Sequence, residues 1–374
     1  MTAPAEVAVV GAGVVGLCAA HALRLRGVPV VVYEPGVPGN AQSGGPSRVF
    51  RHAHDDPRMI AAARASRALW REWGGRLGVE AVSGDGAVAI GDAVPRRLAL
   101  LEEDGGVPAR ALAPDELAAL MPWLARYDGP AMLDPDGGAI RTDASIAALA
   151  AGLGEALVAD EVIALRLRDD GRVDLVAGGG TRRVRHALVC AGRGTEALVR
   201  PLGIVPPVRH AAHIRLTFRM RGAPPARLPC LQDSSGAFGE SAVYAAALPG
   251  NAAIGLGIAE DVDAGPGAVD AGLLEAAAER AGAYVGRALP GVDPHPVGSR
   301  ACWVTKLPWG ADGVAVWRAG GVLALAGHNL FKQGPVLGEA LADMVTGAEP
   351  ALDLRPEARM GSATPIGRPR TFPP

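Results

Sequence analysis

Three glycines near the N-terminus give this chain its first chemical signal. Gly11, Gly13 and Gly16 match the spacing G-x-G-x-x-G, an apolar run precedes them, and a helix-like stretch that includes Val15 follows. In such a unit the first glycine permits a tight turn, the second lets a pyrophosphate approach the backbone, and the third lets the helix pack closely on the sheet. The helix N-terminus also offers N–H groups and a positive dipole end to phosphates. The segment is therefore typical of a dinucleotide-binding unit.

An acidic residue completes this unit. Glu34 ends the second apolar run, where its carboxylate can accept hydrogen bonds from both hydroxyls of a ribose. The acid favours an unphosphorylated ribose, so FAD or NAD is expected rather than NADP. An ordinary glycine-rich turn between a strand and a helix is the structural alternative. The fingerprint alone does not choose between FAD and NAD.

Two later segments contain cations that could bind an anionic substrate. The segment SRVFRH contains Arg48 and Arg51, and the segment GHNLFK ends at Lys332. Only Lys306 and Lys332 are lysines among the 37 basic residues, so each retained lysine is notable. Guanidinium and ammonium groups held in a dry pocket bind a carboxylate well. The alternative is that these side chains are ordinary solvated charges.

Composition and charge exclude several classes of function. The 374 residues suffice for two domains, 49% of them are hydrophobic, and the net charge of −2 comes with no basic block. Binding to nucleic acid or to a membrane surface through bulk charge is therefore not expected. No apolar run is long enough to span a bilayer and the N-terminus lacks a basic segment, so we expect a cytoplasmic protein without a signal peptide. The four cysteines are widely spaced, and no metal site is predicted.

The hydrophobic periodicity predicts alternating strands and helices in the first part of the chain. Strand-like runs separated by Pro/Gly turns dominate residues 205–295, where an antiparallel sheet is expected. Residues 131–141 contain a Pro-Asp-Gly turn and are predicted to form a hairpin. The other predicted strands are 7–10, 28–33, 86–91, 157–168, 172–177, 183–190, 213–219, 241–247, 252–258, 302–305 and 322–326. The predicted helices are 16–26, 57–77, 95–103, 114–120, 142–153, 272–288 and 335–346.

These elements indicate an α/β (α+β) protein with a Rossmann-type nucleotide-binding domain and an inserted antiparallel-sheet substrate domain. Pro-rich sequence after about residue 355 is expected to lie outside the regular elements. The expected division is residues 1–85, 140–205 and 296–360 for the nucleotide-binding domain, residues 86–139 and 206–295 for the substrate domain, and residues 361–374 for a tail.

Taken together, the motifs resemble a known enzyme family. The glycine fingerprint, SRVFRH, a CWVT segment that begins at Cys302, and GHNLFK occur in the order found in the glycine oxidase/D-amino-acid oxidase superfamily of FAD enzymes. The chain most resembles the monomeric sarcosine oxidase branch, over roughly residues 5–350. The resemblance implies a Rossmann-type FAD-binding domain and a substrate domain whose antiparallel sheet covers the flavin. It also implies oxidation of an amine beside a carboxylate: a hydride leaves the α-carbon for flavin N5, the imine hydrolyses, and the electrons pass to an acceptor, usually O2.

The resemblance also implies roles for individual residues. It places Arg51 and Lys332 where the substrate carboxylate is bound, Arg48 against the flavin ring, and Tyr244 on the substrate side. Cys302 matches the position that carries a covalent bond to the flavin 8α-methyl group, which a nucleophilic thiolate could form. For Tyr244 and Cys302 the alternatives are a half-buried sheet residue and a small core residue.

Further cofactor contacts are expected around the flavin and the pyrophosphate. N–H groups in the loop of His328 and Asn329, together with the following helix, should face the ribityl chain and flavin O2 and stabilise the negative charge of reduced flavin. His52 is either a site residue or a structural histidine. The remaining expected cofactor contacts are Val15, Ser43, Ser47, Val162, Ala191, Gly192 and Gly327, together with Arg48, Cys302 and Lys332.

One position departs from the sarcosine oxidase pattern. The lysine that activates oxygen in that branch corresponds to Gly255, and no lysine occurs before Lys306. Without a cation there, we expect oxygen to react slowly or by another route. The glycine also leaves room beside the flavin, and the loop before Lys332 is shorter than in that branch. We therefore expect an N-substituted glycine or a cyclic secondary amino acid as substrate; a biosynthetic tailoring role rests on analogy alone.

The sequence leaves the electron acceptor and the assembly open. We expect a flavin amine oxidase whose partners are a small amino-acid or amine substrate and O2. A flavin dehydrogenase with another acceptor, an NAD-dependent dehydrogenase and a non-catalytic flavin-binding protein are the alternatives. The two cation-bearing segments argue against the NAD enzyme. The chain is expected to be a monomer or a homodimer.

Overall fold

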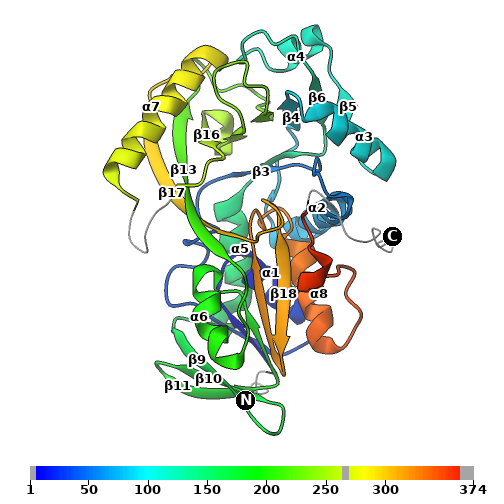
Figure 1. The fold of residues 1–374 in the computed structure, drawn as a ribbon, viewed down its shortest axis with the longest axis vertical. Coiled ribbons are helices and arrows are strands. Elements are labelled where there is room, and N and C mark those ends of the chain that lie inside the picture. Colours follow the sequence, from blue (N-terminus) through cyan, green and yellow to red (C-terminus); the bar gives the residue numbers. More distant parts are fainter. Residues whose placement is uncertain (1–5, 263–268, 363–374) are drawn as a thin grey trace.

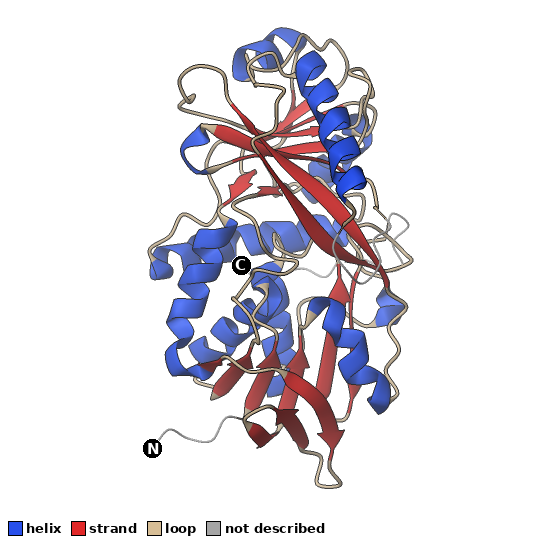
Figure 2. Ribbon diagram, turned by 90° about the vertical axis from the view of Figure 1, so that its left-hand side faces the viewer, coloured by secondary structure: helices blue, strands red, loops and turns tan. Residues whose placement is uncertain are grey.

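The computed structural model describes residues 6–262 and 269–362. Two lobes are stacked along the long axis of the molecule (Figure 1). The lower lobe carries a sheet with helices packed against it, and the upper lobe carries a larger sheet with helices beside it (Figure 2). Long strands run from the upper lobe into the junction between the lobes (Figures 1 and 2).

The lower sheet is formed from short, apolar segments. Its strand order is β18-β19-β12-β1-β2-β8, and neighbouring strands are parallel except for β18, which runs antiparallel to β19. Every residue of β1 and β2 is buried, as expected for a parallel sheet that is covered on both faces. The strands are β1 (Val7–Val10), β2 (Val30–Tyr33), β8 (Leu157–Val158), β12 (His186–Val189), β18 (Val314–Ala319) and β19 (Val322–Gly327).

Four helices cover one face of this sheet and share a core with Val7 and Val9. The helices α1 and α8 pack very closely, because a Cβ on Gly338 would lie 2.6 Å from the carbonyl carbon of Cys18. α2 begins after Asp56, whose side chain accepts a hydrogen bond from the N–H of the second helical residue. The helices are α1 (Val14–Leu25), α2 (Pro57–Leu77), α5 (Thr142–Leu153) and α8 (Gly334–Thr346).

A small antiparallel sheet and a short helix cover the opposite face. Ala8 and Val10, which alternate with Val7 and Val9 along β1, belong to this second core. The strand order is β11-β10-β9. The elements are β9 (Val162–Leu167), β10 (Val173–Ala177), β11 (Gly180–Val184) and α6 (Thr195–Val199).

The upper lobe contains an eight-stranded sheet in the order β17-β13-β16-β15-β14-β4-β6-β5, antiparallel except between β14 and β4. Ile214, Leu216 and Phe218 of β13 share a core with α7, so the alternate residues of that strand face the other way. The elements are β4 (Ala87–Ile90), α3 (Val94–Asp104), β5 (Arg110–Ala111), α4 (Pro114–Leu120), β6 (Ala131–Asp134), β13 (Arg209–Arg219), β14 (Cys230–Asp233), β15 (Val243–Ala247), β16 (Ala253–Ile258), α7 (Ala271–Ala288) and β17 (Gly298–Lys306).

The predicted hairpin over residues 131–141 is wrong. A turn is present, because the N–H of Gly137 donates to the carbonyl of Asp134 at 3.2 Å. However, β6 pairs with β4 and β5, whereas β7 (Gly138–Ile140) pairs with β3 (Arg48–Phe50) in a separate two-stranded sheet. A turn between two strand-like runs does not by itself determine that the runs pair with each other.

Two other predicted strands each divide between two sheets. Residues 157–168 form β8 in the lower sheet and β9 in the small sheet, and residues 183–190 end β11 and then form β12. Strand-like runs that continue across a change of sheet hide the boundary, because the residue pattern does not mark the point at which the partner strand changes. β18 is absent from the predicted strands, although it pairs along its whole length with β19.

Residues 355–362 pack against the lower lobe, which corrects the expected irregular tail in this stretch. They include a short 3-10 helix, Pro356–Ala358, and Met360 is 2% exposed. The carbonyl of Met360 accepts hydrogen bonds from the N–H of Val314 and from Nε1 of Trp309, each at 3.1 Å. The rest of the expected tail, residues 363–374, lies outside the described residues.

The predicted fold class is confirmed, because a mostly parallel sheet covered by helices is joined to a large, mainly antiparallel sheet. The division into domains stays a prediction. β17 pairs with β13 in the upper sheet, although the expected boundary at residue 296 assigns it to the nucleotide-binding domain. Within residues 6–262 and 269–362, no helix combines the length and the apolar character that crossing a membrane requires.

Candidate functional site

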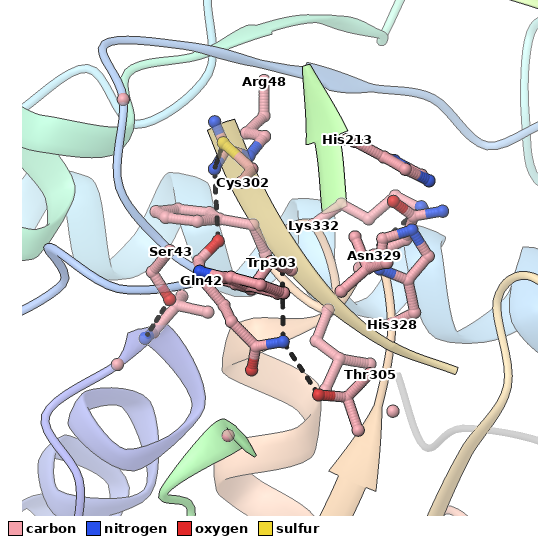
Figure 3. Close-up of a pocket in the computed structure, with 18 of the residues that line it drawn as sticks. Gln42, Ser43, Arg48, His213, Cys302, Trp303, Thr305, His328, Asn329 and Lys332 are labelled. Carbon is pink, nitrogen blue, oxygen red and sulfur yellow. Dashed lines mark hydrogen bonds between the residues drawn. The ribbon is translucent and has the colours of Figure 1, made fainter. Parts of the chain in front are cut away.

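Residues from both lobes line a cavity of about 1080 Å³, and Figure 3 shows part of this lining. It is lined at one end by the turn after β1 and by the end of β2. At the other end it is lined by the upper sheet, by the segment around β3, and by the loop before α8. Its size is at the upper limit of the ~300–1,000 Å³ of most small-molecule sites. A dinucleotide and a small substrate could therefore share it.

The turn between β1 and α1 is built from backbone that leaves no space for side chains. Gly11 has a φ of +99°, and a Cβ there would lie 2.6 Å from the carbonyl oxygen of Cys190. A Cβ on Gly16 would overlap the carbonyl oxygen of Gly11, so this glycine packs the helix against the turn and does not line the cavity. The first N–H groups of α1 have no acceptor inside the helix. One of them, from Val14, donates to Ser43 Oγ at 3.0 Å (Figure 3).

Glu34 lies directly after β2 and lines the same end of the cavity. Its Oε2 accepts a hydrogen bond from the N–H of Ala12 at 2.9 Å, and its Oε1 accepts one from Gly36 at 3.1 Å. The carboxylate therefore braces the glycine turn. Each carboxylate oxygen can accept a further hydrogen bond, so the side chain could also bind ribose hydroxyls.

The other residues expected to contact the cofactor are brought together along this cavity. Only Gly16, which packs beneath the turn, is absent from its lining. His328 contacts His213 edge to face, with ring centroids 5.2 Å apart, and burial lowers the pKa of His328 to about 3. Its imidazole is therefore neutral at pH 7. The lining residues in this group are Gly13, Val15, Ser43, Ser47, Val162, Ala191, Gly192, Gly327, His328 and Asn329.

Arg48 and Cys302 meet at the middle of the cavity lining (Figure 3). The guanidinium of Arg48 donates to the carbonyls of Gln42 and Ser47, each at 3.2 Å, and to that of Gly44. Its Nη2 lies 4.0 Å from the sulfur of Cys302, which is 3% exposed. These carbonyls fix the position of Arg48, which places a positive charge beside the thiol.

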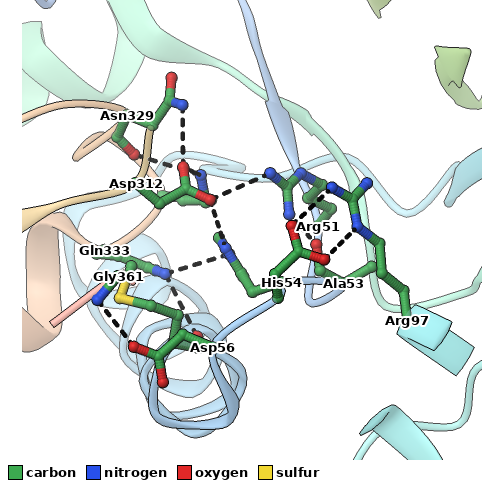
Figure 4. A network of polar contacts seen from close by, with 12 residues as sticks. Arg51, Ala53, His54, Asp56, Arg97, Asp312, Asn329, Gln333 and Gly361 are labelled. Carbon is green, nitrogen blue, oxygen red and sulfur yellow. Dashed lines mark hydrogen bonds and ion pairs between the residues drawn. The ribbon is translucent and has the colours of Figure 1, made fainter. Parts of the chain in front are cut away.

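Asp312 lies at the centre of a polar cluster at the substrate end (Figure 4). Its Oδ2 lies 2.8 Å from His54 Nδ1 and 3.3 Å from Arg51 Nη2. Its Oδ1 lies 2.9 Å from Asn329 Nδ2 and 3.5 Å from Lys332 Nζ. The carboxylate therefore bridges Arg51 and Lys332, the two residues expected at the substrate carboxylate. We call Arg51, His54, Asp312 and Lys332 the Asp312 cluster.

Burial and charge shift the titration of this cluster. Burial lowers the pKa of Lys332 to about 8, against the opposing effect of Asp312. Burial also lowers the pKa of His54 to about 3, so its imidazole is neutral at pH 7. Burial alone would raise the pKa of Asp312, but the charges of Lys332 and Arg51 hold it well below its usual range. At pH 7 the cluster contains two cations and one carboxylate, and its net charge of +1 suits one further carboxylate.

Tyr244 lines the cavity from the upper sheet, as its expected substrate-side position requires. Its Oη accepts a hydrogen bond from Nε of Arg215 at 3.2 Å. Gly255 also lines the cavity, and a Cβ there would make only an ordinary contact of 3.5 Å with Leu248 Cδ1. The room expected at this glycine is therefore present. Lys306 does not fill it, because its Nζ is ion-paired with Asp261 outside the cavity lining.

His52 is placed as a structural histidine and does not line the cavity. It is 2% exposed, and its Nδ1 lies 2.9 Å from Asp134 Oδ2. The same carboxylate also accepts the N–H of His52 at 2.8 Å. These contacts hold the chain directly after Arg51 against β6.

Three site residues were not identified from the sequence. Asp312 precedes a glycine and looks like an ordinary turn residue, His54 follows another histidine closely, and Arg215 is one of many arginines. Arg215 occurs on the same strand face as His213, so alternation along β13 could have placed both together once that strand was assigned. No local pattern could have paired Asp312 with Arg51 and Lys332, because the three come from separate segments.

The residues present fit an FAD molecule. The glycine turn excludes side chains where a pyrophosphate would lie, and α1 offers N–H groups there. Glu34 keeps acceptor capacity for a ribose. The cavity then continues past Arg48 and Cys302 to the Asp312 cluster, which leaves space for a flavin and a substrate beyond the nucleotide.

A comparison with protein families gives one match over most of the chain. The family described as "FAD dependent oxidoreductase" (DAO) matches residues 6–344. A curated relative from Maricaulis maris (strain MCS10), the tRNA 5-methylaminomethyl-2-thiouridine biosynthesis bifunctional protein MnmC, is 29% identical over 358 residues. These residues are 92% of this chain and 53% of the relative, so the chain spans about half the length of that protein.

Solved structures share the fold at low sequence identity. NikD, described as an unusual amino acid oxidase essential for nikkomycin biosynthesis, is 22% identical over 94% of this chain and 96% of its own, with a TM-score of 0.80. L-proline dehydrogenase from P. horikoshii is 18% identical over 96% and 98%, with a TM-score of 0.81. Glycine oxidase from Geobacillus kaustophilus is 23% identical over 98% and 100%, with a TM-score of 0.78.

Proposed function

Because the chain belongs to the DAO family of FAD-dependent oxidoreductases, we propose that it oxidises the C–N bond of an amino acid and uses O2 as the electron acceptor. The substrate class that we propose is an N-substituted glycine or a cyclic secondary amino acid. The amine loses two electrons and two protons and becomes an imine, O2 gains them and becomes H2O2, and water then hydrolyses the imine. FAD supplies the two-electron chemistry when it is bound.

One observation carries this proposal. A single cavity joins the glycine turn after β1 to the cations of the Asp312 cluster. A nucleotide site alone would fit many functions, and a buried cation pair alone could be structural. Their position at opposite ends of one cavity supports an anionic substrate held beyond the nucleotide.

Arg51 and Lys332 would hold the substrate carboxylate. The guanidinium of Arg51 can bind it through two parallel hydrogen bonds, and the ammonium of Lys332 adds a point charge. Asp312 holds both side chains in place and leaves the cluster with a net charge of +1. Fixing the carboxylate would also fix the α-carbon and the amine, which is the positioning that oxidation requires.

The upper sheet supports a substrate larger than N-methylglycine. Gly255 lies between Thr217 and Ala246 in the cross-strand register, so small residues form this part of the cavity. The space above Gly255 could accept a substituent on the amine or the ring of a cyclic amino acid. The neighbouring structures of an amino acid oxidase, a proline dehydrogenase and a glycine oxidase support amino-acid chemistry without selecting a substrate.

A substrate screen tests this function. The flavin-loaded protein is incubated in air with N-methylglycine, N-ethylglycine, proline and pipecolate, and H2O2 is measured. Each acid is matched with its carboxamide, which keeps the amine and removes the anion. We expect saturable H2O2 formation from at least one acid and far less from its amide. Equal rates with acids and amides would contradict binding through the carboxylate.

The electron acceptor needs a separate test, because Gly255 provides no cation for oxygen. This residue favours one alternative, a dehydrogenase that passes electrons to another acceptor. Steady-state rates in air are compared with rates under nitrogen with an artificial quinone acceptor. We expect the rate in air to be at least equal to the rate with quinone; a rate in air that is negligible beside it would establish the dehydrogenase.

We also propose that Cys302 binds the flavin covalently. Cys302 lines the cavity, and its sulfur lies 4.0 Å from Nη2 of Arg48. The linkage replaces the S–H bond and one C–H bond of the 8α-methyl group with a C–S bond, and O2 takes up the two electrons and two protons and becomes H2O2. Acid precipitation of the purified protein should leave the flavin with the polypeptide, and the intact mass should increase by that of FAD less two hydrogen atoms. The variant Cys302→Ala should release all flavin into the supernatant, whereas Cys230→Ala, which changes a buried cysteine away from the cavity, should not. Free flavin from the unmodified protein would disprove the linkage.

A further inference from the structure

Three residues form a row across the upper sheet. Tyr244 on β15, Gly257 on β16 and Arg215 on β13 are direct cross-strand partners. Because the middle residue is glycine, Arg215 Nε reaches across it and donates to Tyr244 Oη at 3.2 Å. The guanidinium carbon lies 5.6 Å from the centre of the Tyr244 ring. A Cβ on Gly257 would lie 2.5 Å from Tyr244 Cζ, so this arrangement requires the glycine.

Arg215 differs from Arg51 and Arg97 in its partners. Arg51 is ion-paired with Asp312 at 3.3 Å, and Arg97 is ion-paired with Asp55 at 3.2 Å. For Arg215, no carboxylate from residues 6–262 or 269–362 comes within ion-pair distance; its hydrogen-bond partner is the hydroxyl group of Tyr244. A half-buried guanidinium without a counterion is unfavourable, because it has lost water and gained no opposite charge.

The next strand increases this excess of positive charge. Arg300 on β17 lies directly opposite Arg215 in the cross-strand register, and both residues line the cavity. Nη2 of Arg300 donates to the carbonyl and side-chain oxygens of Asn40 at 2.8 and 2.9 Å. Like charges on directly opposite residues destabilise a sheet. An anion bound at this face would offset both unfavourable terms.

The chemistry of the pair suits a carboxylate. Arg215 uses Nε for Tyr244, which leaves its two terminal nitrogens as a fork that matches two carboxylate oxygens. The hydroxyl of Tyr244 accepts from Arg215 and can donate its own hydrogen to the same ligand. The Asp312 cluster, whose members form no hydrogen bond or ion pair with Arg215 or Tyr244, has a net charge of +1 and suits one carboxylate by itself. The cavity therefore has two separate positions for anions.

We propose that Arg215 and Tyr244 form a second carboxylate-binding position, so that the substrate is a dicarboxylic amino acid. This inference rests on the proposed function, in which Arg51 and Lys332 bind the first carboxylate. The substrate is then an N-substituted glycine whose substituent ends in a second carboxylate. Gly257 is the residue that allows the position to form, because it lets the two side chains meet.

A pair of isosteric probes tests this position. N-(2-carboxyethyl)glycine carries the second carboxylate, and N-(2-carbamoylethyl)glycine has a neutral amide of the same shape. We expect kcat/KM to be at least ~10-fold higher for the acid, since a hydrogen-bonded charge is worth that much. Homologues with one methylene fewer or more would show which chain length spans the two positions.

Variants of Arg215 test whether this side chain causes the preference for the acid probe over the amide probe. Arg215→Met should remove the preference, so that the ratio of kcat/KM for the acid to kcat/KM for the amide falls to about one. Arg215→Lys keeps the positive charge and loses the paired terminal nitrogens of the guanidinium, so it should retain part of the preference for the acid. This variant replaces Arg215→Met in the test if the Met variant folds poorly. Arg219→Met changes an exposed arginine on the same strand and should behave like the unmodified protein.

The possible failures are distinguishable. If acid and amide are oxidised with equal efficiency, the second position is wrong while the proposed function stands. A fall of equal size for both probes in Arg215→Met would also overturn it, because it would show a structural role. If the two probes, N-ethylglycine, proline and pipecolate all fail to reduce the flavin, the proposed function itself fails.

Discussion

The two ends of the cavity are built in different ways. At the nucleotide end the backbone forms the site: Gly11 turns the chain at a φ of +99°, α1 begins there, and Glu34 accepts a hydrogen bond from the turn at 2.9 Å. At the substrate end charged side chains form the site. Arg51, Asp312 and Lys332 come from three separate segments and meet through one carboxylate.

This difference predicts which substitutions each end tolerates. A site made of closely packed backbone should fail when atoms are added, whatever their charge. A site made of buried charges should tolerate small changes of shape and respond strongly to changes of charge and pH. Four substitutions test this difference between the two ends of the cavity.

The largest effect is expected for Gly16→Ala at the nucleotide end. The added methyl group would overlap the carbonyl oxygen of Gly11. The variant should lose about 3 kcal/mol or more of unfolding free energy, at the upper end of overpacking. It should also be purified with little or no flavin. Urea unfolding and the flavin content per chain measure this; an unchanged midpoint with full flavin would contradict the steric account of this end.

Lys332→Met should have the next largest effect, at the substrate end. It removes one of two cations expected at the substrate carboxylate, and kcat/KM should fall roughly 10- to 100-fold, mainly through KM. Lys306→Met is the matched control, because Lys306 is paired with Asp261 outside the cavity lining. Similar losses of kcat/KM in both variants would show that Lys332→Met disturbs the structure in general and does not specifically weaken carboxylate binding.

Asp312→Asn should change the pH dependence of carboxylate binding. Lys332 has a pKa of about 8, so affinity for a non-oxidisable carboxylate such as acetate should be constant at low pH and fall as pH rises through about 8. Asp312 supports the charged form of Lys332, so removing that charge lowers this pKa further and moves the midpoint to lower pH. Equilibrium titrations from pH 6 to pH 9 measure both midpoints.

The control for this shift is Asp293→Asn, which changes an exposed carboxylate beside His295. The pH midpoint of carboxylate affinity in this variant should match that of the unmodified protein. A midpoint that stays in place or rises in Asp312→Asn would show that Asp312 does not set the charge of Lys332.

The smallest effect is expected for Gly255→Ala, a glycine at the substrate end. The added Cβ would contact only Leu248 Cδ1 at 3.5 Å, an ordinary packing distance. Stability should change by less than about 0.5 kcal/mol, and flavin binding should not change. The contrast with Gly16→Ala tests the comparison directly, because the same methyl group is added at both ends. A collapse of flavin content in Gly255→Ala would break it.

The sequence was most informative where the signal is local. The strand, the glycines, α1 and Glu34 lie close together along the chain, and each residue type has a steric reason for its place. The role of Lys332 at the substrate carboxylate was predicted from a family resemblance together with the scarcity of lysine. Asp312 could not be predicted, because its partners are brought to it only by the packing of β18 and α8 with the segment after β3.

The strands show the same limit. Residues 157–168 and 183–190 each look like one apolar strand, yet each divides between two sheets. Hydrophobic alternation predicts that a residue is buried and does not predict against which neighbour. The contact between Arg215 and Tyr244 could not be predicted for the same reason. It depends on the strand register, which places Gly257 between these two residues.

Anaerobic reduction of the flavin shows most directly whether the protein oxidises a secondary amino acid that it binds through the carboxylate of the substrate. The flavin-loaded protein is mixed without oxygen with N-substituted glycines, cyclic secondary amino acids and their carboxamides, and the flavin absorbance is followed. The account predicts saturable bleaching by at least one acid, with little bleaching by the matching amide. A flavin that dithionite reduces but that none of these acids bleaches would contradict it.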